Sequence, residues 1–239
     1  MVLGCGLMGS AIARDLVESG GMEVTIAARD ERKLREYVAQ LGSERASAVG
    51  VDARDERALV ELMRGFDVVA GALPGRLGFG AMRAAIEAGT DMVDISFMPQ
   101  NPLELDDPAR AAGVTIIPDC GVAPGLSNMF VGYGASRLDR VKEVHIKVGG
   151  LPQNPMPPLG YRITWSVEDL LEEYTRRARI VQGGHIKEVE ALSGLELVDF
   201  PGIGELECFY TDGLRTLLHT VKADVMDEKT LRIPDTPRR

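Results

Sequence analysis

Apolar and polar residues follow two alternating patterns along the first half of the chain. Short apolar runs that are typical of buried strands lie at residues 2–3, 23–28, 48–51, 67–72, 92–96 and 114–117. Stretches with a helical repeat of apolar positions follow them at residues 10–19, 31–41, 57–63, 80–88 and 103–112. Strands that alternate with helices in this way predict an α/β fold with a doubly wound parallel sheet.

The pattern changes after Pro118. Residues 141–148 alternate polar and apolar side chains, which predicts a half-buried antiparallel strand. Further short strands are expected at residues 161–166, 180–182, 186–189, 195–198 and 206–210. Helices are expected after the turn-rich segment 119–128, over 167–177 and over 211–221, with a proline-rich loop over 149–160. We therefore predict one domain over residues 1–120 and an α+β domain with a mostly antiparallel sheet over residues 121–239.

A glycine-rich turn stands between the first predicted strand and the first predicted helix. Gly4, Gly6 and Gly9 have the GxGxxG spacing, and residues 23–28 supply the second strand of the unit. Gly4 allows the tight turn, Gly6 lets the backbone approach a pyrophosphate, and Gly9 lets the helix pack closely on the strand. The helix N-terminus then offers N–H groups and a partial positive charge to the phosphates. This context predicts a Rossmann-type domain that binds NAD or NADP.

The end of the second strand is where the adenosine ribose of such a cofactor is recognised. An acidic residue is expected there for NAD, but the chain has Ala28 followed by Arg29 and Asp30. Arg29 favours NADP because a guanidinium can hold the 2′-phosphate, whereas Asp30 leaves NAD open. The residues expected to bind the cofactor are Gly4, Gly6, Leu7, Met8, Gly9, Ala28, Arg29, Asp30, Asp52, Ala72, Leu73 and Pro74.

Composition argues against several other classes of protein. The formal net charge of -9 disfavours nucleic acid as a partner, since a phosphate backbone repels an acidic surface. No apolar run approaches membrane-spanning length, and the N-terminus lacks the segments of a signal peptide. The three cysteines are widely separated, so that neither a disulfide framework nor a metal site is predicted. We expect a soluble, cytoplasmic protein.

Both ends of the chain are short for the predicted architecture. Only Met1, Val2 and Leu3 precede Gly4, and the tail over residues 233–239 is rich in residues that break strands and helices. We expect a trimmed chain or, alternatively, a short natural relative.

Longer motifs occur in both halves of the chain. In the first half they are GALPGRLGF at 71–79, DMVDISFMP at 91–99 and NPLEL at 101–105. In the second half they are GVAPGLSN at 121–128, GGLP at 149–152, ITWS at 163–166, EEYT at 172–175 and TDGLR at 211–215. With these motifs in this order, the chain resembles the saccharopine dehydrogenase family, and within it most of all the lysine 6-dehydrogenases. The resemblance implies hydride transfer between a nicotinamide ring and a carbon that bears nitrogen, in a homo-oligomer formed through the second domain.

Two departures from the family bear on substrate and cofactor. Saccharopine reductases carry an acidic residue at the position of Ala123 and an arginine near Asp212, and both are absent here, which favours the smaller substrate lysine. Lysine dehydrogenases have an acidic residue at or beside the position of Ala28, so the choice between NAD and NADP stays open. The predicted activity is oxidative deamination of L-lysine at its ε-carbon. The alternatives are a saccharopine or carboxynorspermidine type reductase and a non-catalytic NAD(P)-binding member.

Deamination requires a proton acceptor for the amine and a cation for the carboxylate of the substrate. The candidate acceptors are Asp94, near the end of the predicted strand 92–96, and Asp119, which begins the turn after the strand 114–117. The alternative role is a helix or turn cap for Asp94 and an Asx-turn for Asp119. His219 is a third candidate for catalysis, with an ordinary helix histidine as the alternative. On the predicted helix it lies one turn beyond Arg215, the candidate for the α-carboxylate, for which a surface salt bridge is the alternative.

Further substrate contacts are expected from Ser96 and Asp212, and from the pair Trp165 and Ser166. The family resemblance places this tryptophan–serine pair against the substrate, whereas a lone tryptophan in a strand is otherwise read as a core residue. Cys120 is expected to be a packed small residue, since hydride transfer needs no thiol.

Overall fold

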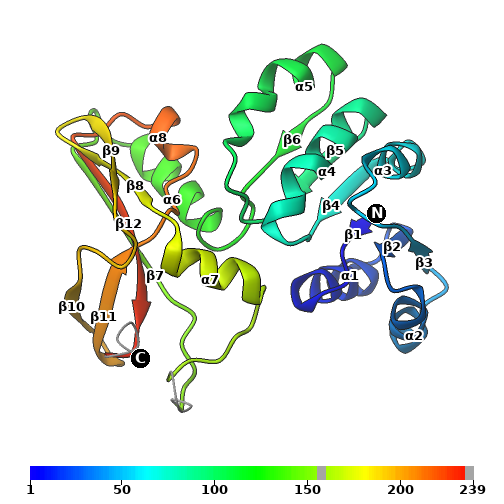
Figure 1. Ribbon diagram of the computed structural model, residues 1–239, viewed down its shortest axis with the longest axis horizontal. Helices are drawn as coiled ribbons and strands as arrows, with labels where there is room; N and C mark the ends of the chain where they lie inside the picture. Colours follow the sequence, from blue (N-terminus) through cyan, green and yellow to red (C-terminus); the bar gives the residue numbers. More distant parts are fainter. Residues whose placement is uncertain (155–159, 235–239) are drawn as a thin grey trace. The chain divides into compact units, whose positions relative to one another are not determined.

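The computed structural model describes residues 1–154 and 160–234, and the chain divides into two compact units, residues 1–120 and 121–239 (Figure 1). The predicted loop over 149–160 and the tail over 233–239 therefore lie partly outside the described residues. Within the described part, each helix is too short or too polar to cross a lipid bilayer.

The first unit alternates strands and helices along its whole length (Figure 1). Its elements are β1 (Val2–Leu3), α1 (Leu7–Ser19), β2 (Val24–Ala28), α2 (Glu31–Leu41), β3 (Ala46–Gly50), α3 (Glu56–Met63), β4 (Val68–Gly71), α4 (Gly75–Ala88), β5 (Asp91–Asp94), the 3-10 helix η1 (Pro102–Leu105), α5 (Asp106–Ala112) and β6 (Ile116–Ile117). The strands form one parallel sheet in the order β3-β2-β1-β4-β5-β6. The predicted doubly wound sheet is confirmed, and α4 begins five residues before the predicted helix at 80–88.

The short strand β1 lies at the centre of this sheet. Val2 pairs with Ile26 on one side and with Ala70 on the other. Because successive strand residues point to opposite faces, Val2 packs with α1 and α2 while Leu3 packs with α3 and α4. Two consecutive apolar residues thus contribute to both cores of the unit. The strand order reverses at β1 and β4, which is where sheets of this type bind their ligands.

The second unit contains a six-stranded mixed sheet. Its elements are α6 (Leu126–Ala135), β7 (Glu143–Val148), α7 (Val167–Thr175), β8 (Ala178–Gln182), β9 (His185–Val189), β10 (Glu196–Phe200), β11 (Gly204–Tyr210), α8 (Leu217–Thr220) and β12 (Val225–Arg232). The sheet order is β10-β11-β12-β8-β9, and β7 also pairs with β12. Four of the expected short strands are present as β8 to β11, and their pairings are antiparallel.

Three expectations for this unit are wrong. The strand at 141–148 is β7, with Val144 and Ile146 buried as predicted, but it pairs parallel to β12 and not antiparallel. Residues 161–166 form no strand. The helix expected over 211–221 is reduced to the four residues of α8, because the backbone at Arg215 has a left-handed φ of 50° that a helix cannot accommodate.

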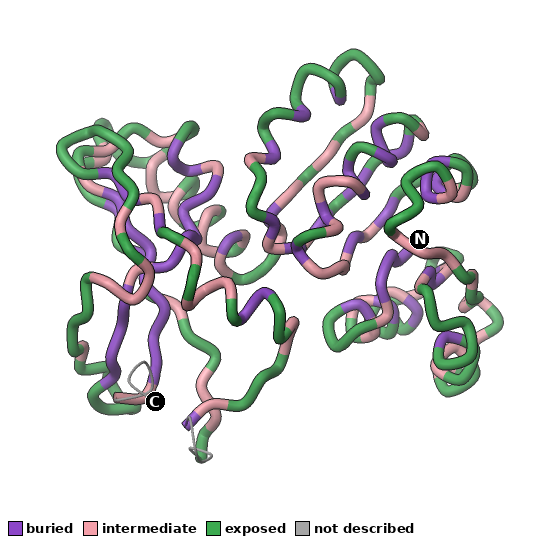
Figure 2. The backbone as a smooth tube through the Cα atoms, in the orientation of Figure 1, coloured by how far each residue is buried: buried purple, intermediate pink, exposed green. Residues whose placement is uncertain are grey.

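The strand β12 carries most of the pairing in the second unit and was not predicted. It pairs with β7, β8 and β11, and all its residues after Val225 are buried (Figure 2). Its sequence, VMDEKTLR, is mostly polar and therefore lacks the apolar pattern of a central strand. The buried charges of β12 are held by partners from other elements, which a local sequence pattern does not reveal.

Candidate functional site

The turn between β1 and α1 is held tightly against the loop after β4. Gly4 has a φ of 108°, and a Cβ at this position would overlap the carbonyl oxygen of Ala72. A Cβ at Gly9 would overlap the carbonyl of Gly4. The amide of Ala72 donates a hydrogen bond of 2.8 Å to the carbonyl of Leu3, which fixes the two loops to each other. The structure thus brings the glycine turn and Ala72 together, as expected for a phosphate-binding turn.

The space around Gly6 fits a pyrophosphate. A Cβ built on Gly6 would have no atom within 4 Å, so the backbone here faces open space. Leu7 and Met8 begin α1 as exposed residues, and the first turn of this 13-residue helix carries no acidic side chain. Free N–H groups and the helix dipole at such a terminus attract anions. The residues present therefore fit the phosphates of a dinucleotide.

The loops after β2 and β3 carry the residues expected to recognise the ribose. Arg29 is exposed, while the carboxylate of Asp30 caps α2 by accepting a hydrogen bond of 3.1 Å from the amide of Lys33. Asp52 accepts hydrogen bonds from the guanidinium of Arg54, which holds the pKa of this carboxyl well below its usual range. Asp30 is therefore engaged by its own helix, and Arg54 is a charged neighbour that the sequence reasoning did not select.

Asp94 lies at the end of β5 and is fully buried. Its Oδ1 accepts hydrogen bonds from the amide of Ser96, at 2.8 Å, and from the Ser96 hydroxyl. Its Oδ2 packs against Gly71 of β4 and makes no hydrogen bond within the described residues. The pKa of Asp94 is raised to about 6, mainly by burial and in smaller part by the charge of Asp119, against the opposing effect of the hydrogen bonds from Ser96. The turn-capping role considered for Asp94 is thus present, combined with a carboxyl that titrates near neutral pH.

Asp119 and Cys120 lie beside Asp94 at the end of the first unit. The amide of Cys120 donates a hydrogen bond of 2.9 Å to the carbonyl of Asp94. Asp119 is buried with a left-handed φ of 58°, a conformation that is uncommon for a residue with a side chain. Burial, with the charges of Asp94 and Asp119, raises the pKa of the Cys120 thiol, so the thiol stays protonated and poorly nucleophilic. The structure therefore brings Asp94, Ser96 and Asp119 together.

In the second unit, Trp165 and Ser166 are the last two residues before α7. The indole N–H of Trp165 donates to the hydroxyl of Tyr161 at 3.3 Å. The hydroxyl of Ser166 accepts from the amide of Asp169 and caps α7. Tyr174 packs against Phe209 and contacts the guanidinium of Arg232, consistent with a packing role.

The structure separates the residues that were placed together on the predicted 211–221 helix. Asp212 is buried and accepts hydrogen bonds of 2.9 and 2.8 Å from Nε and Nη2 of Arg179 on β8. Arg215 is buried before α8 begins, whereas His219 is exposed within α8. The prediction that Arg215 and His219 share a helix face is therefore wrong. An arginine does lie beside Asp212, but it comes from β8 and not from the neighbouring sequence.

A buried acidic group that the sequence reasoning missed is Glu228 of β12. Its Oε2 accepts hydrogen bonds from the Thr211 hydroxyl, at 2.5 Å, and from the amide of Gly213, at 3.1 Å. Burial raises the pKa of Glu228 to about 8, with further contributions from Glu173 and Asp212. Glu228 therefore holds the loop that carries Asp212 and Arg215. No local signal in the sequence marks it, because VMDEKTLR reads as an exposed segment.

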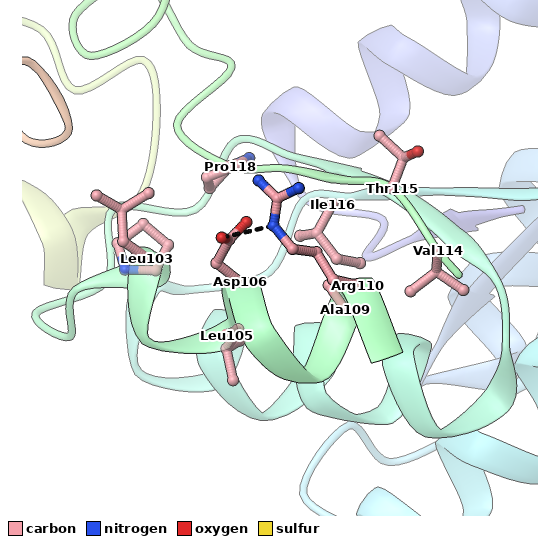
Figure 3. Close-up of a pocket in the computed structure, with 10 residues that line it drawn as sticks. Leu103, Leu105, Asp106, Ala109, Arg110, Val114, Thr115, Ile116 and Pro118 are labelled. Atoms are coloured by element: carbon pink, nitrogen blue, oxygen red, sulfur yellow. Dashed lines mark hydrogen bonds and ion pairs between the residues drawn. The ribbon is translucent and has the colours of Figure 1, made fainter. Parts of the chain in front are cut away.

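A cavity of 250 Å³ lies between η1, α5 and β6 (Figure 3). Asp106 and Arg110, which form an ion pair of 2.8 Å, are among the residues that line this cavity. The cavity is at the β6 edge of the sheet, away from the glycine turn at the central strand β1. Within the described residues, no group of three histidine, cysteine, aspartate or glutamate side chains forms a metal site.

The fold and the glycine turn define a Rossmann-type dinucleotide-binding domain joined to a mixed-sheet domain. Residues 1–117 match the family model of the saccharopine dehydrogenase NADP binding domain, and residues 121–239 match that of the saccharopine dehydrogenase C-terminal domain. The chain belongs to the saccharopine dehydrogenase family, and its first unit is an NAD(P)-binding domain.

Curated relatives include the NADP(+)-dependent, L-glutamate-forming saccharopine dehydrogenase of Saccharomyces cerevisiae, which is 26% identical over 80% of this chain and 44% of its own length. The mitochondrial alpha-aminoadipic semialdehyde synthase of Bos taurus is 26% identical over 85% of this chain and 23% of its own length. The carboxyaminopropylagmatine dehydrogenase of a Synechocystis strain is 23% identical over 92% of this chain and 58% of its own length. The chain therefore spans less than two thirds of the length of these relatives.

The solved structure of apo saccharopine dehydrogenase (L-Glu forming) from Saccharomyces cerevisiae has the same fold. It superposes with a TM-score of 0.78 at 23% identity, covering 99% of this chain and 55% of its own. The folds of both units therefore also occur in this yeast enzyme.

Proposed function

We propose that this chain acts in an oxidoreductase that transfers a hydride between NAD(P) and a nitrogen-bearing carbon of an amino acid, with the ε-carbon of L-lysine as the site of oxidation. The observation that carries this proposal is the glycine turn of β1 and α1 in a chain whose two units both match the saccharopine dehydrogenase family. The choice of lysine rests on Ala123, which stands where saccharopine reductases carry an acidic residue.

The cofactor accepts the hydride when it is bound, and the protein must bind it, orient it and accept a proton. Gly4, Gly6 and Gly9 shape the turn for the pyrophosphate, and the N-terminus of α1 provides the N–H groups. Ala72, Leu73 and Pro74 form the loop between β4 and α4. Ligands of such sheets bind at the carboxyl ends of the strands, where this loop lies.

We assign the proton to the pair Asp94 and Asp119. Oxidation of an amine releases a proton from nitrogen, and its acceptor works best with a pKa near the working pH. Asp94 has a pKa of about 6, and the charge of Asp119 contributes to it. Burial does not single out one member of the pair, since Asp94 is 0% exposed and Asp119 is 5% exposed. His219 has no part in it, since it is exposed on α8 whereas Arg215 is buried before that helix begins.

A second candidate is a saccharopine type reductase. The relatives named for saccharopine favour it, and so does the guanidinium of Arg179 beside Asp212. Arg179 thus supplies an arginine beside Asp212 from β8, where the segment next to Asp212 in the sequence was expected to lack one. The guanidinium of Arg179 lies in a mostly buried pair with Asp212, whose side chains are 24% and 3% exposed, and this reduces its capacity to hold a substrate carboxylate.

The purified chain should be assayed with lysine and with saccharopine, each with NAD and NADP, by the absorbance of the reduced nicotinamide. Reduction of the cofactor by lysine supports the proposal, whereas reduction by saccharopine alone selects the second candidate. Binding of the cofactor without its reduction by either substrate indicates a non-catalytic member. Asp94→Asn should remove the acidic limb of the pH profile of kcat/KM, whereas Asp107→Asn on the exposed first turn of α5 should leave it unchanged. A homo-oligomer stays a prediction that light scattering would test.

A further inference from the structure

The ends of β2 and β3 lie side by side at the edge of the sheet where a dinucleotide places its adenosine ribose. Ala28 pairs with Gly50 in the β2–β3 ladder, and the amide of Val51 donates to the carbonyl of Ala28 at 3.0 Å. Arg29 and Asp52 therefore follow adjacent strands, and the charge of Arg29 acts on the carboxyl of Asp52. These two residues and Arg54 form what we call the ribose corner.

The other acidic groups next to this corner are held by helix starts, and Asp55 caps α3 by accepting a hydrogen bond of 3.0 Å from the amide of Ala58. Asp30 caps α2 through the amide of Lys33, and Glu31 pairs with Arg35 at 2.9 Å. Arg29 forms no hydrogen bond or ion pair with another residue in the part of the chain that the structure describes. The corner therefore holds one carboxylate, that of Asp52, and two guanidinium groups.

The carboxylate of Asp52 binds both the guanidinium and the backbone amide of Arg54. Nε of Arg54 lies 3.0 and 3.1 Å from the two oxygens of Asp52, and Nη2 lies 2.5 Å from Oδ2. The amide of Arg54 donates to Oδ1 at 3.0 Å. These contacts use Nε and Nη2, which leaves the N–H groups on Nη1 for a further acceptor. Asp52 and Arg54 are 36% and 61% exposed in their side chains, so a ligand can reach the pair.

We propose that Arg54 is the second guanidinium, with Arg29, that binds the 2′-phosphate of NADP, and that Asp52 is the group that favours NAD. This inference rests on the proposed binding of NAD(P) and adds the residues that choose between the two cofactors. A doubly charged phosphate needs cations, which Arg29 supplies with its whole guanidinium and Arg54 with the N–H groups on Nη1. The 2′-hydroxyl of NAD needs an acceptor, which a carboxylate supplies. Asp52 is repelled by the phosphate, and Arg54 compensates its charge.

The test is the affinity for NADP, NAD and the fragment 2′,5′-ADP, measured by calorimetry on the full chain and its variants. Arg54→Ala should raise the Kd for NADP and 2′,5′-ADP about five- to tenfold, the effect of losing one charge-assisted contact at an exposed site, with little change for NAD. Asp52→Asn should change the preference in the other direction, weakening NAD relative to NADP. Higher salt should reduce the effect of Arg54→Ala, since it screens the phosphate contact.

The matched control is Arg110→Ala, which removes an exposed arginine from its ion pair with Asp106 at the opposite edge of the sheet. It should leave all three affinities unchanged. The inference is overturned if Arg54→Ala behaves like this control, or if it weakens NADP and NAD equally. Wild-type protein that binds neither cofactor would instead overturn the proposed function itself. Binding of both cofactors with an unchanged preference in Arg54→Ala and Asp52→Asn rejects the inference and leaves the proposed function intact.

Discussion

Gly71 and Asp94 are register partners on β4 and β5, and the carboxylate of Asp94 occupies the space that a side chain on Gly71 would need. A Cβ on Gly71 would overlap Oδ2 of Asp94 and the methyl group of Met92. The absence of a side chain at this position is therefore what allows a carboxyl to be buried inside a parallel sheet. It also keeps that carboxyl in a surrounding that raises its pKa.

Gly71→Ala is accordingly expected to destabilise the first unit by about 2–3 kcal/mol, because the core around it cannot yield without moving a strand. Gly65→Ala provides the control, since a Cβ there meets only Leu62 at an ordinary 3.6 Å and its effect should stay within about 0.5 kcal/mol. Denaturant unfolding followed by circular dichroism measures both. Equal stability of the two variants would contradict the described packing of Asp94.

Alanine substitutions of Gly6 and Gly9, the second and third glycines of the phosphate turn, should have different effects. Gly9→Ala forces a methyl group into the carbonyl of Gly4 and should lower the stability of the first unit. Gly6→Ala has free space, so this variant should fold with wild-type stability. Its methyl group would instead stand where the pyrophosphate approaches, and the Kd for NAD(P) should rise at least about tenfold. Unchanged cofactor binding in Gly6→Ala would show that the pyrophosphate lies elsewhere.

Glu228 should make the stability of the second unit fall as the pH rises. Its pKa is raised from the ordinary 4.5 to about 8 in the folded state, so folding favours the protonated form. This contribution is fully present below pH 4.5 and is lost as the pH rises to about 8. Glu228→Gln removes the ionisation and should flatten this part of the curve. Fluorescence of Trp165, the one tryptophan of the sequence, reports the unfolding of this unit.

The same slope in wild type and Glu228→Gln would assign the pH dependence to another group. His145 is the obvious candidate, since Glu143 and Asp227 raise its pKa. Its stabilising charge is also lost as the pH rises, so His145→Gln serves as the comparison.

The ion pair between Arg179 and Asp212 should be sensitive to the loss of either partner. Arg179→Ala leaves a buried carboxylate uncompensated and should cost about 3 kcal/mol in the unfolding free energy of the second unit. Arg177→Ala is the control two positions earlier, because its pairs with Glu188 and Glu190 are exposed and should contribute less than about 1 kcal/mol. A similar small effect of both variants would mean that Asp212 is solvated in solution.

The alternating pattern of the first half predicted the first unit well, because each of its elements is stabilised largely by its own apolar residues. Helix α2 has the predicted bounds, 31–41, since Asp30 caps its start and Gly42 ends it in a left-handed conformation. The start of α4 at Gly75 was missed, because the glycines and proline of this loop are typical of a turn. The helix forms there through its packing on α3 and β5.

The second unit was predicted less well wherever polar residues are buried. The strand β12 was missed because its charged residues find partners on other elements, such as Thr211 for Glu228 and Glu173 for Arg232. The helix expected over 211–221 was wrong for the same reason. Its first residues, Thr211 to Gly213, are held by Arg179 and Glu228 in a loop conformation.

The sequence by itself determined the doubly wound sheet, the glycine turn and the family, because these depend on local apolar spacing and on motifs of contiguous residues. Tertiary structure decided the surroundings of each polar side chain. It buried Asp94 against Gly71 and placed Arg54 on Asp52 and Arg179 on Asp212. Free energies of charged groups depend on burial and on partners that are distant in the sequence, so only the folded chain reveals which of them titrate near neutral pH or remain available to a ligand.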